Sequence, residues 1–154
     1  MASTEPFFIV GVHRSGTTLL RYMFSSSSRI YIPPESDFIP TFFQKCPHAE
    51  LSALQVDKIL NRVFDKYRFA SEWQGKQPTV ADLLPGDSRF TPASVLNGLY
   101  AQYARQNDAV RWADKTPIYT NYILLIHSMF PQAKFIHIIR DGRDVSVSMM
   151  EKWG

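Results

Sequence analysis

The chain has 154 residues, of which 45% are hydrophobic and 20% charged, so it is long enough to bury the core of one globular domain. The net charge of +3 is small and no window is dominated by Lys or Arg, which gives no support for nucleic-acid binding. The single cysteine, Cys46, excludes a disulfide framework within the chain, and the longest apolar runs are too short to span a bilayer. We therefore expect a cytoplasmic protein with no metal and no transmembrane segment.

The first third of the chain alternates between strand and helix signals. The apolar run at 7–10 is bounded by a proline and a glycine, as expected of a buried parallel strand. Apolar residues then recur with helical spacing over 17–24, and the serine run at 25–28 is expected to end that helix. A second short strand is predicted over 29–32, where two prolines stop it.

Helices dominate the middle of the chain, and a strand returns near its end. An apolar stripe predicts a helix over 51–67, and the pair Thr91–Pro92 is a cap and first turn that opens another helix. A third helix is predicted over 118–130, followed by an isoleucine-rich strand over 134–140 and a helix over 144–153. This order predicts an α/β fold of three layers with a central parallel sheet.

Residues 11–18, GVHRSGTT, form the loop between the first predicted strand and helix. Nucleotide hydrolases have the pattern G-x-x-x-x-G-K-[ST] at this place, and here Gly11, Gly16 and Thr18 hold the glycine and hydroxyl positions. Gly16 permits a turn that aims backbone N–H groups at one anion, and the helix dipole adds to the attraction. Thr17 replaces the lysine that reaches the β- and γ-phosphates of a triphosphate, whereas Arg14 adds a cation inside the loop. The loop therefore favours a ligand with one phosphate and one further anionic group.

Two segments of this chain resemble sulfotransferases, which transfer a sulfuryl group from 3′-phosphoadenosine 5′-phosphosulfate. VGVHRSGTTLLRYM at 10–23 is similar to their 5′-phosphosulfate loop, and IHIIRDGRDVSVSMM at 136–150 is similar to their 3′-phosphate motif. ADKTP at 113–117 matches a further segment of one branch, and the motif style is closest to the tyrosylprotein sulfotransferase-like branch. The resemblance covers essentially the whole chain. It implies a P-loop-hydrolase-like fold and the phosphosulfate donor as co-substrate, without a metal.

The resemblance implies a role for each residue of the first motif. Arg14 would contact the bridging oxygen of the donor and steady the leaving group. The residues that would bind the 5′-phosphate through N–H groups and hydroxyls are Ser15, Gly16, Thr17 and Thr18. The alternative for these loop residues is a purely structural turn.

The second motif implies a pair of residues for the 3′-phosphate. Arg140 ends the predicted strand and Ser148 lies on the next helix, so both can face one anion. The alternative for Arg140 is a surface ion pair with Asp141 or Asp144, and the alternative for Ser148 is a solvent-facing position. Asp141 and Arg143 are expected to shape the loop.

Activation of the acceptor is assigned from IYIPPESDFIP at 30–40, which resembles the stretch that holds the catalytic base in the same branch. This implies Glu35 as the base; the alternative is a surface carboxylate or a cap for the segment that follows. The branch has arginine where this chain has Asp37, so a protein-tyrosine acceptor is not favoured over a small-molecule, glycan or lipid acceptor. Lys115 is expected near the transferring group, where it would stabilise charge, with a solvated loop lysine as the alternative.

Sulfotransferase domains usually continue past the second motif, so the resemblance implies that residues 1–154 are the N-terminal part of one domain, incomplete at the C-terminus. Three functions remain open. The first is sulfuryl transfer, and the second is a non-catalytic remnant that binds adenosine 3′,5′-bisphosphate. The third is a nucleotide kinase, against which the missing loop lysine counts. The sequence leaves the acceptor and the oligomeric state open.

Overall fold

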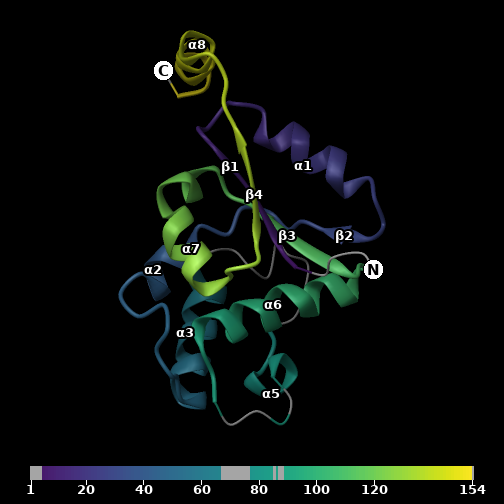
Figure 1. Cartoon of the computed structure of the whole chain (residues 1–154), viewed down its shortest axis with the longest axis vertical. Coiled ribbons are helices and arrows are strands. Elements are labelled where there is room, and N and C mark those ends of the chain that lie inside the picture. Colours follow the sequence, from purple (N-terminus) through teal and green to yellow (C-terminus); the bar gives the residue numbers. More distant parts are fainter. Residues whose placement is uncertain (1–4, 67–76, 85, 87–88, 154) are drawn as a thin grey trace.

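A computed structural model of the chain describes residues 5–66, 77–84, 86 and 89–153 (Figure 1). Its elements in chain order are β1 (Phe7–Gly11), α1 (Thr17–Ser25), β2 (Ile30–Tyr31), α2 (Phe38–Phe43), α3 (Ala53–Lys66), α5 (Val80–Leu83), α6 (Pro92–Gln106), β3 (Arg111–Lys115), the 3-10 helix η1 (Pro117–Tyr122), α7 (Ile123–Met129), β4 (Lys134–Ile138) and α8 (Gly142–Trp153).

The four strands form one parallel sheet in the order β2-β3-β1-β4. The register places Ile9 opposite Lys115 and Gly11 opposite Ile138. Because all the strands run in the same direction, their carboxyl ends meet at one edge, where ligands of open α/β sheets bind. The prediction of an α/β fold with a central parallel sheet is confirmed.

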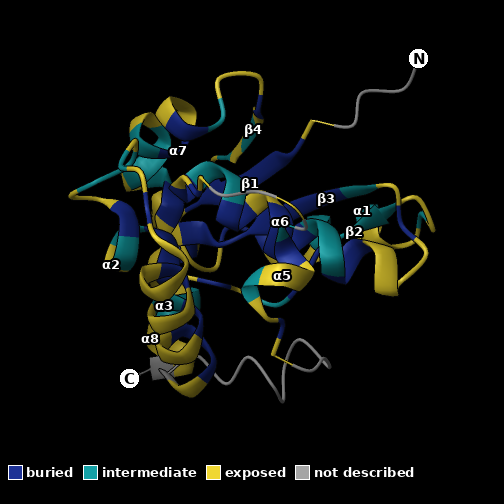
Figure 2. Cartoon of the chain, turned by 90° about the horizontal axis from the view of Figure 1, so that it is seen from below, coloured by how far each residue is buried: buried dark blue, intermediate teal, exposed yellow. Residues whose placement is uncertain are grey.

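Alternate residues of β1 face two different hydrophobic clusters, which makes the fold three layers deep. Phe8 and Val10 lie in the larger cluster with side chains from α2, α3, α6 and α7. Phe7 and Ile9 lie in a smaller cluster, which Leu20 and Phe24 of α1 partly cover. Figure 2 shows burial concentrated in β1, β3 and α6, whereas the visible surface of α8 is largely exposed.

The helix α6 forms as its sequence predicts. Thr91 and Ser94 make a reciprocal capping box at its N-terminus, with Pro92 in the first turn. Its predicted apolar stripe is at most 1% exposed: Leu96, Leu99, Tyr100 and Tyr103. Through this stripe α6 packs against β3 and the larger hydrophobic cluster.

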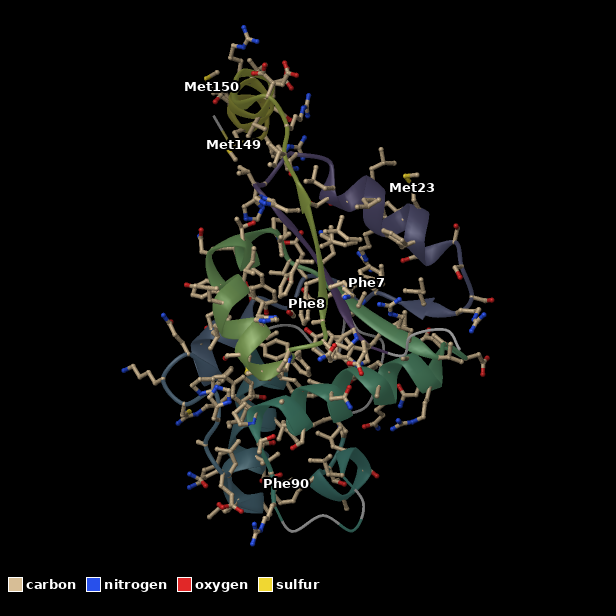
Figure 3. The ribbon with its side chains drawn as sticks, viewed as in Figure 1. Phe7, Phe8, Met23, Phe90, Met149 and Met150 are labelled. Atoms are coloured by element: carbon tan, nitrogen blue, oxygen red, sulfur yellow. The ribbon has the colours of Figure 1, made fainter. Side chains whose placement is uncertain are left out.

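Other helices differ in detail from the sequence patterns. The predicted helix over 118–130 is divided into η1 and α7. The helix predicted over 51–67 begins only at Ala53, and its buried face contains Val56, Leu60 and Val63, so Leu54 on the opposite side is exposed. Residue 67 lies outside the described part of the chain. On α1, Leu19 and Met23 are exposed rather than buried, and Figure 3 shows Met23 on the outer side of that helix.

Candidate functional site

The loop at 11–18 connects the end of β1 to α1 and has the geometry of an anion-binding turn. Gly16 is the N-cap of α1 with φ of 101°, and Arg14 also adopts a left-handed conformation with φ of 68°. Both the N–H and the hydroxyl of Ser15 donate to the Val12 carbonyl, at 3.2 and 2.6 Å, so in this structure Ser15 closes the turn. No side chain caps α1 and its first turn has no acidic residue, so the N–H groups of Thr17 and Thr18 remain for an anion.

Gly11 allows the loop to pass close to the neighbouring strand. A Cβ at this position would lie 2.7 Å from the backbone oxygen of Ile138, which is too close for a carbon atom. We therefore expect Gly11→Ala to force β1 and β4 apart and to lower the free energy of unfolding by about 1–3 kcal/mol in urea titration. Gly142→Ala is the matched control, because a Cβ there would meet nothing within 4 Å. Equal stability of the two variants would contradict this explanation.

Both residues predicted to bind the 3′-phosphate contact Arg14, which is predicted to contact the bridging oxygen of the donor. Arg14 Nε donates to Ser148 Oγ at 3.0 Å, and Arg140 Nη1 donates to the Arg14 backbone oxygen at 3.0 Å. Arg140 also approaches Asp144, but its Nε is 3.8 Å from the carboxylate and the arginine side chain is 43% exposed. The Arg14 and Arg140 side chains thus connect the loop after β1 to α8 and to the segment after β4. Solvent can reach both guanidinium groups.

Asp141 and Arg143 form a separate local ion pair between β4 and α8. The Asp141 carboxylate accepts hydrogen bonds from the Arg143 guanidinium, at 2.7 and 3.1 Å, and from the Arg143 backbone N–H at 2.9 Å. These bonds hold the pKa of Asp141 below its ordinary value. Asp141 directly precedes α8 and Arg143 is the second residue of that helix, where its side chain is 90% exposed.

Glu35 and Lys115 meet beside the other end of the loop. Lys115 Nζ donates to Glu35 Oε1, and it also lies 3.4 Å from Thr18 Oγ1. The Lys115 side chain is only 3% exposed because it ends β3, so it is not a solvated loop residue; the Glu35 side chain is 42% exposed. Asp37, not Glu35, occupies the N-cap position of α2. A buried cation and a reachable carboxylate are thus paired next to the uncapped end of α1.

Asp114 and Ser36 are fully buried neighbours of this pair that the sequence patterns did not single out. Ser36 Oγ donates to Asp114 Oδ2 at 2.8 Å, and the Tyr100 hydroxyl donates to the same oxygen at 2.6 Å. A charged dipeptide inside an otherwise buried strand, Asp114–Lys115, is the signal that could have indicated them.

The burial of Asp114 gives folding a defined dependence on pH. Burial raises the pKa of Asp114, while its hydrogen bonds and the charge of Lys115 oppose that shift. Because the folded state then holds the proton more tightly, the contribution of Asp114 to stability is complete below its ordinary pKa of about 3.9 and is lost as pH rises toward the raised pKa. We expect the melting temperature of Asp114→Asn to rise relative to the wild type over this range. Parallel melting curves at all pH values would contradict the shift.

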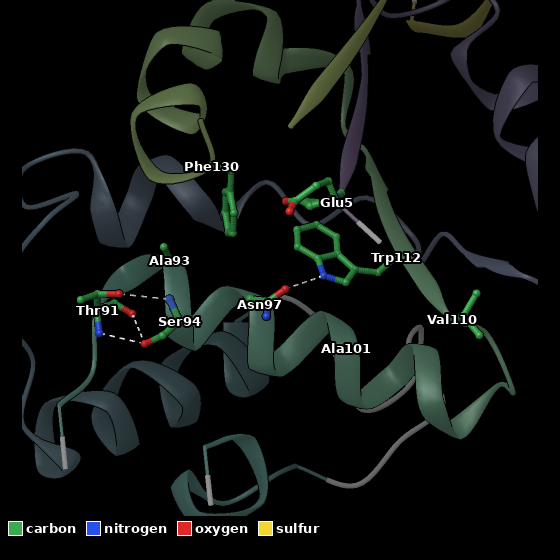
Figure 4. A pocket seen from close by; sticks show the side chains of 10 residues that line it. Glu5, Thr91, Ala93, Ser94, Asn97, Ala101, Val110, Trp112 and Phe130 are labelled. Atoms are coloured by element: carbon green, nitrogen blue, oxygen red, sulfur yellow. Dashed lines mark hydrogen bonds between the residues drawn. The ribbon is translucent and has the colours of Figure 1, made fainter. Parts of the chain in front are cut away.

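The described residues show no metal cluster and no membrane-spanning helix, and they form a cavity away from this site. No cluster of three or more His, Cys, Asp or Glu side chains there could hold a metal ion, and no helix there is long and apolar enough to cross a membrane. A cavity of about 600 Å³ lies near the amino ends of the strands, between Glu5, Asn97, Trp112 and Phe130 (Figure 4). It is at the opposite end of the sheet from the loop at 11–18.

The chain is similar to one protein family and to several known proteins. The model of a family described as "Sulfotransferase family" matches residues 6–153. The chain is 30% identical over 148 residues to an uncharacterised protein of Aquifex aeolicus, and 26% identical over 149 residues to the nodulation protein NoeE of Sinorhizobium fredii. It is 26% identical over 156 residues to protein-tyrosine sulfotransferase A of Caenorhabditis elegans.

These matches cover nearly all of this chain but a small part of each relative. The three alignments span 95%, 96% and 97% of this chain, and 17%, 31% and 34% of the relatives' lengths. The solved structure of sulfotransferase STF9 from Mycobacterium avium aligns with 99% of this chain and 47% of its own, with a TM-score of 0.42 and 17% identity.

Proposed function

The chain belongs to the sulfotransferase family, and on this premise we propose that it binds 3′-phosphoadenosine 5′-phosphosulfate and transfers the sulfuryl group to a hydroxyl or amine. The observation that supports this proposal most strongly is the position of three cations. Arg14 follows β1, Lys115 ends β3 and Arg140 follows β4, and the latter two contact the loop that contains the first. Side chains at or just after the carboxyl ends of three strands thus place positive charge around the loop, which has Thr17 where nucleotide hydrolases have a lysine.

The residues around the loop fit a ligand with two anionic ends. The uncapped end of α1 provides N–H donors for a 5′-phosphate. Arg140 and Ser148 provide charge-assisted and hydroxyl donors for a 3′-phosphate. Arg14 lies between them, so its hydrogen bond to Ser148 would be exchanged for contacts with the ligand.

The chemistry that this arrangement supports is an in-line transfer. The acceptor oxygen or nitrogen forms a bond to sulfur, the bond from sulfur to the bridging oxygen breaks, and its electron pair leaves with the 5′-phosphate. Glu35 would take the proton of the acceptor. Arg14 and Lys115 would stabilise the charge that develops on the sulfuryl and bridging oxygens. Lys115 would have to turn from the Glu35 carboxylate toward these oxygens, which would free Glu35 to act as the base.

The acceptor in this proposal is a small molecule, a glycan or a lipid. Asp37 lies two residues after Glu35 at the start of α2, where its negative charge disfavours acidic peptides. A panel of phenols, glycans, lipids and peptides, each incubated with radiolabelled donor, would identify the class of acceptor.

Calorimetric titration tests the binding part of the proposal. We expect adenosine 3′,5′-bisphosphate to bind without a metal and at least about ten-fold more tightly than ATP with magnesium, since one charge-assisted contact contributes about 1.5–3 kcal/mol. Tight, magnesium-dependent binding of ATP would instead support a nucleotide kinase. Binding of the bisphosphate without transfer to any acceptor of the panel would support the non-catalytic remnant.

A further inference from the structure

A buried polar cluster lies beneath the paired Glu35 and Lys115 and takes no part in the roles proposed so far. Its members are at most 1% exposed: Ser36, Tyr100, Asp114 and Tyr119. Ser36 Oγ is 2.8 Å from Asp114 Oδ2 and 2.7 Å from the Tyr119 hydroxyl, and the Tyr100 hydroxyl donates to the same Asp114 oxygen at 2.6 Å. Burial also raises the pKa of both tyrosines, which keeps their hydroxyl groups protonated as donors.

Burying a carboxyl group is costly unless its oxygens are paired, and here only one of them is. Two donors share Asp114 Oδ2, whereas Asp114 Oδ1 has no partner among the described residues. A role in packing alone would be served better by an apolar side chain of similar volume. Stability of the core alone therefore does not explain why these polar side chains are buried together.

The same cluster fixes the turn that contains Glu35. Asp37 has φ of 41°, a left-handed conformation that is unfavourable for a residue other than glycine. Hydrogen bonds hold the chain on both sides of it. Before it, the Ser36 N–H donates to Thr116 Oγ1 at 3.0 Å, and after it, the Ile39 N–H donates to the Tyr119 hydroxyl at 3.2 Å. Both acceptors belong to the segment that follows Lys115 in the chain.

We propose that Asp114 is a positioning residue that acts through Ser36 and holds the Glu35 carboxylate in place beside Lys115. Asp114 and Lys115 are consecutive residues of β3, and Ser36 directly follows Glu35. One strand thus fixes both partners: Lys115 as its own last residue, and Glu35 through the hydrogen bond between Asp114 and Ser36. This inference rests on the proposed function, in which Glu35 is the base.

The variant Ser36→Ala tests this role with little risk to folding, because it removes the Oγ hydrogen bonds but keeps the backbone N–H. We expect kcat for transfer to fall about 10- to 100-fold, as a small misplacement of a reacting group does. The KM for the donor and the affinity for adenosine 3′,5′-bisphosphate should stay unchanged, since Ser36 contacts neither the loop at 11–18 nor Arg140.

Conservative and double variants separate positioning from general stability. Asp114→Asn keeps an oxygen that accepts from Ser36 and Tyr100, so it should retain kcat within about three-fold, whereas Asp114→Ala should not. In a Glu35→Gln background, Ser36→Ala should lower kcat by less than about two-fold further, because the carboxylate that Ser36 positions is already lost. Asn97→Ala is the control: it removes a 2.9 Å hydrogen bond to Trp112 on the same strand and should leave kcat unchanged.

A crystal structure of Ser36→Ala gives a readout that does not depend on activity. We expect the Glu35 carboxylate to leave Lys115 while the loop at 11–18 keeps its form. An unchanged pair, or an equal loss of kcat from Ser36→Ala with and without Glu35, would overturn the positioning role. Absence of bisphosphate binding, or wild-type transfer by Glu35→Gln, would instead overturn the proposed function.

Discussion

Replacing Glu35 with glutamine is expected to slow sulfuryl transfer by about 10²- to 10⁴-fold, the usual contribution of a positioned general base. Glutamine has nearly the same shape and can still accept a hydrogen bond from Lys115 Nζ, but it cannot take the proton of the acceptor. The affinity for adenosine 3′,5′-bisphosphate should change by less than about two-fold, because the lost group acts on the acceptor and not on the nucleotide.

The measurement is steady-state transfer from radiolabelled donor, with the melting temperature as a check on folding. Glu50→Gln is the matched control, because Glu50 is also an exposed carboxylate in an ion pair, with Arg89 at 3.3 Å, away from this site. If Glu35→Gln and Glu50→Gln transfer at the same rate, Glu35 is not the base.

Replacing Arg140 with alanine is expected to weaken adenosine 3′,5′-bisphosphate binding by about 10- to 100-fold, the effect of losing one charge-assisted hydrogen bond to phosphate. Adenosine 5′-monophosphate lacks the 3′-phosphate, so its affinity should hardly change. The variant should therefore reduce the preference for the bisphosphate over the monophosphate, which a general loss of positive charge would not do.

Calorimetric titration of both nucleotides measures that preference. Arg143→Ala is a close control, because it removes the same charge three residues later, where the guanidinium is bonded to Asp141 instead. An equal loss of affinity for the two nucleotides would contradict a 3′-phosphate contact at Arg140, and so would an equal effect of the two arginine variants.

Short sequence patterns correctly predicted a strand, a helix cap and a turn, because neighbouring residues encode each of them. The apolar run at 7–10 forms a buried strand because it packs on both faces, and Thr91 caps α6 through side chains three residues apart. The glycine spacing of the loop at 11–18 likewise predicted a turn that ends at the N-cap of α1. The sequence signal for each of these features lies in neighbouring residues, although the burial of the strand also needs distant partners.

The features that the sequence did not predict depend on distant partners. The strand β3 has the sequence RWADK, and its last two residues are charged yet buried. It therefore lacks the apolar pattern from which a strand is predicted. Asp114 is acceptable there only because Ser36 and Tyr100 donate to it from other elements. Leu54 shows the opposite effect: its spacing indicates a core position, but α3 turns it toward solvent.

The candidate site was predicted from the sequence as two motifs, one carboxylate (Glu35) and one lysine (Lys115), without the contacts between them. The structure brings Arg14 to Ser148 across 134 residues and Lys115 to Glu35 across 80 residues. The parallel sheet explains these contacts, because it gathers the carboxyl ends of separate strands at one edge. The assignment of each residue to a phosphate or to the transferring group remains a proposal.

A crystal structure with adenosine 3′,5′-bisphosphate tests most directly the claim that a single nucleotide joins the two motifs. The proposed binding mode predicts the 5′-phosphate against residues 14–18 at the start of α1, and the 3′-phosphate between Arg140 and Ser148. Density for the nucleotide elsewhere on the protein, or for only one phosphate at these residues, would contradict it.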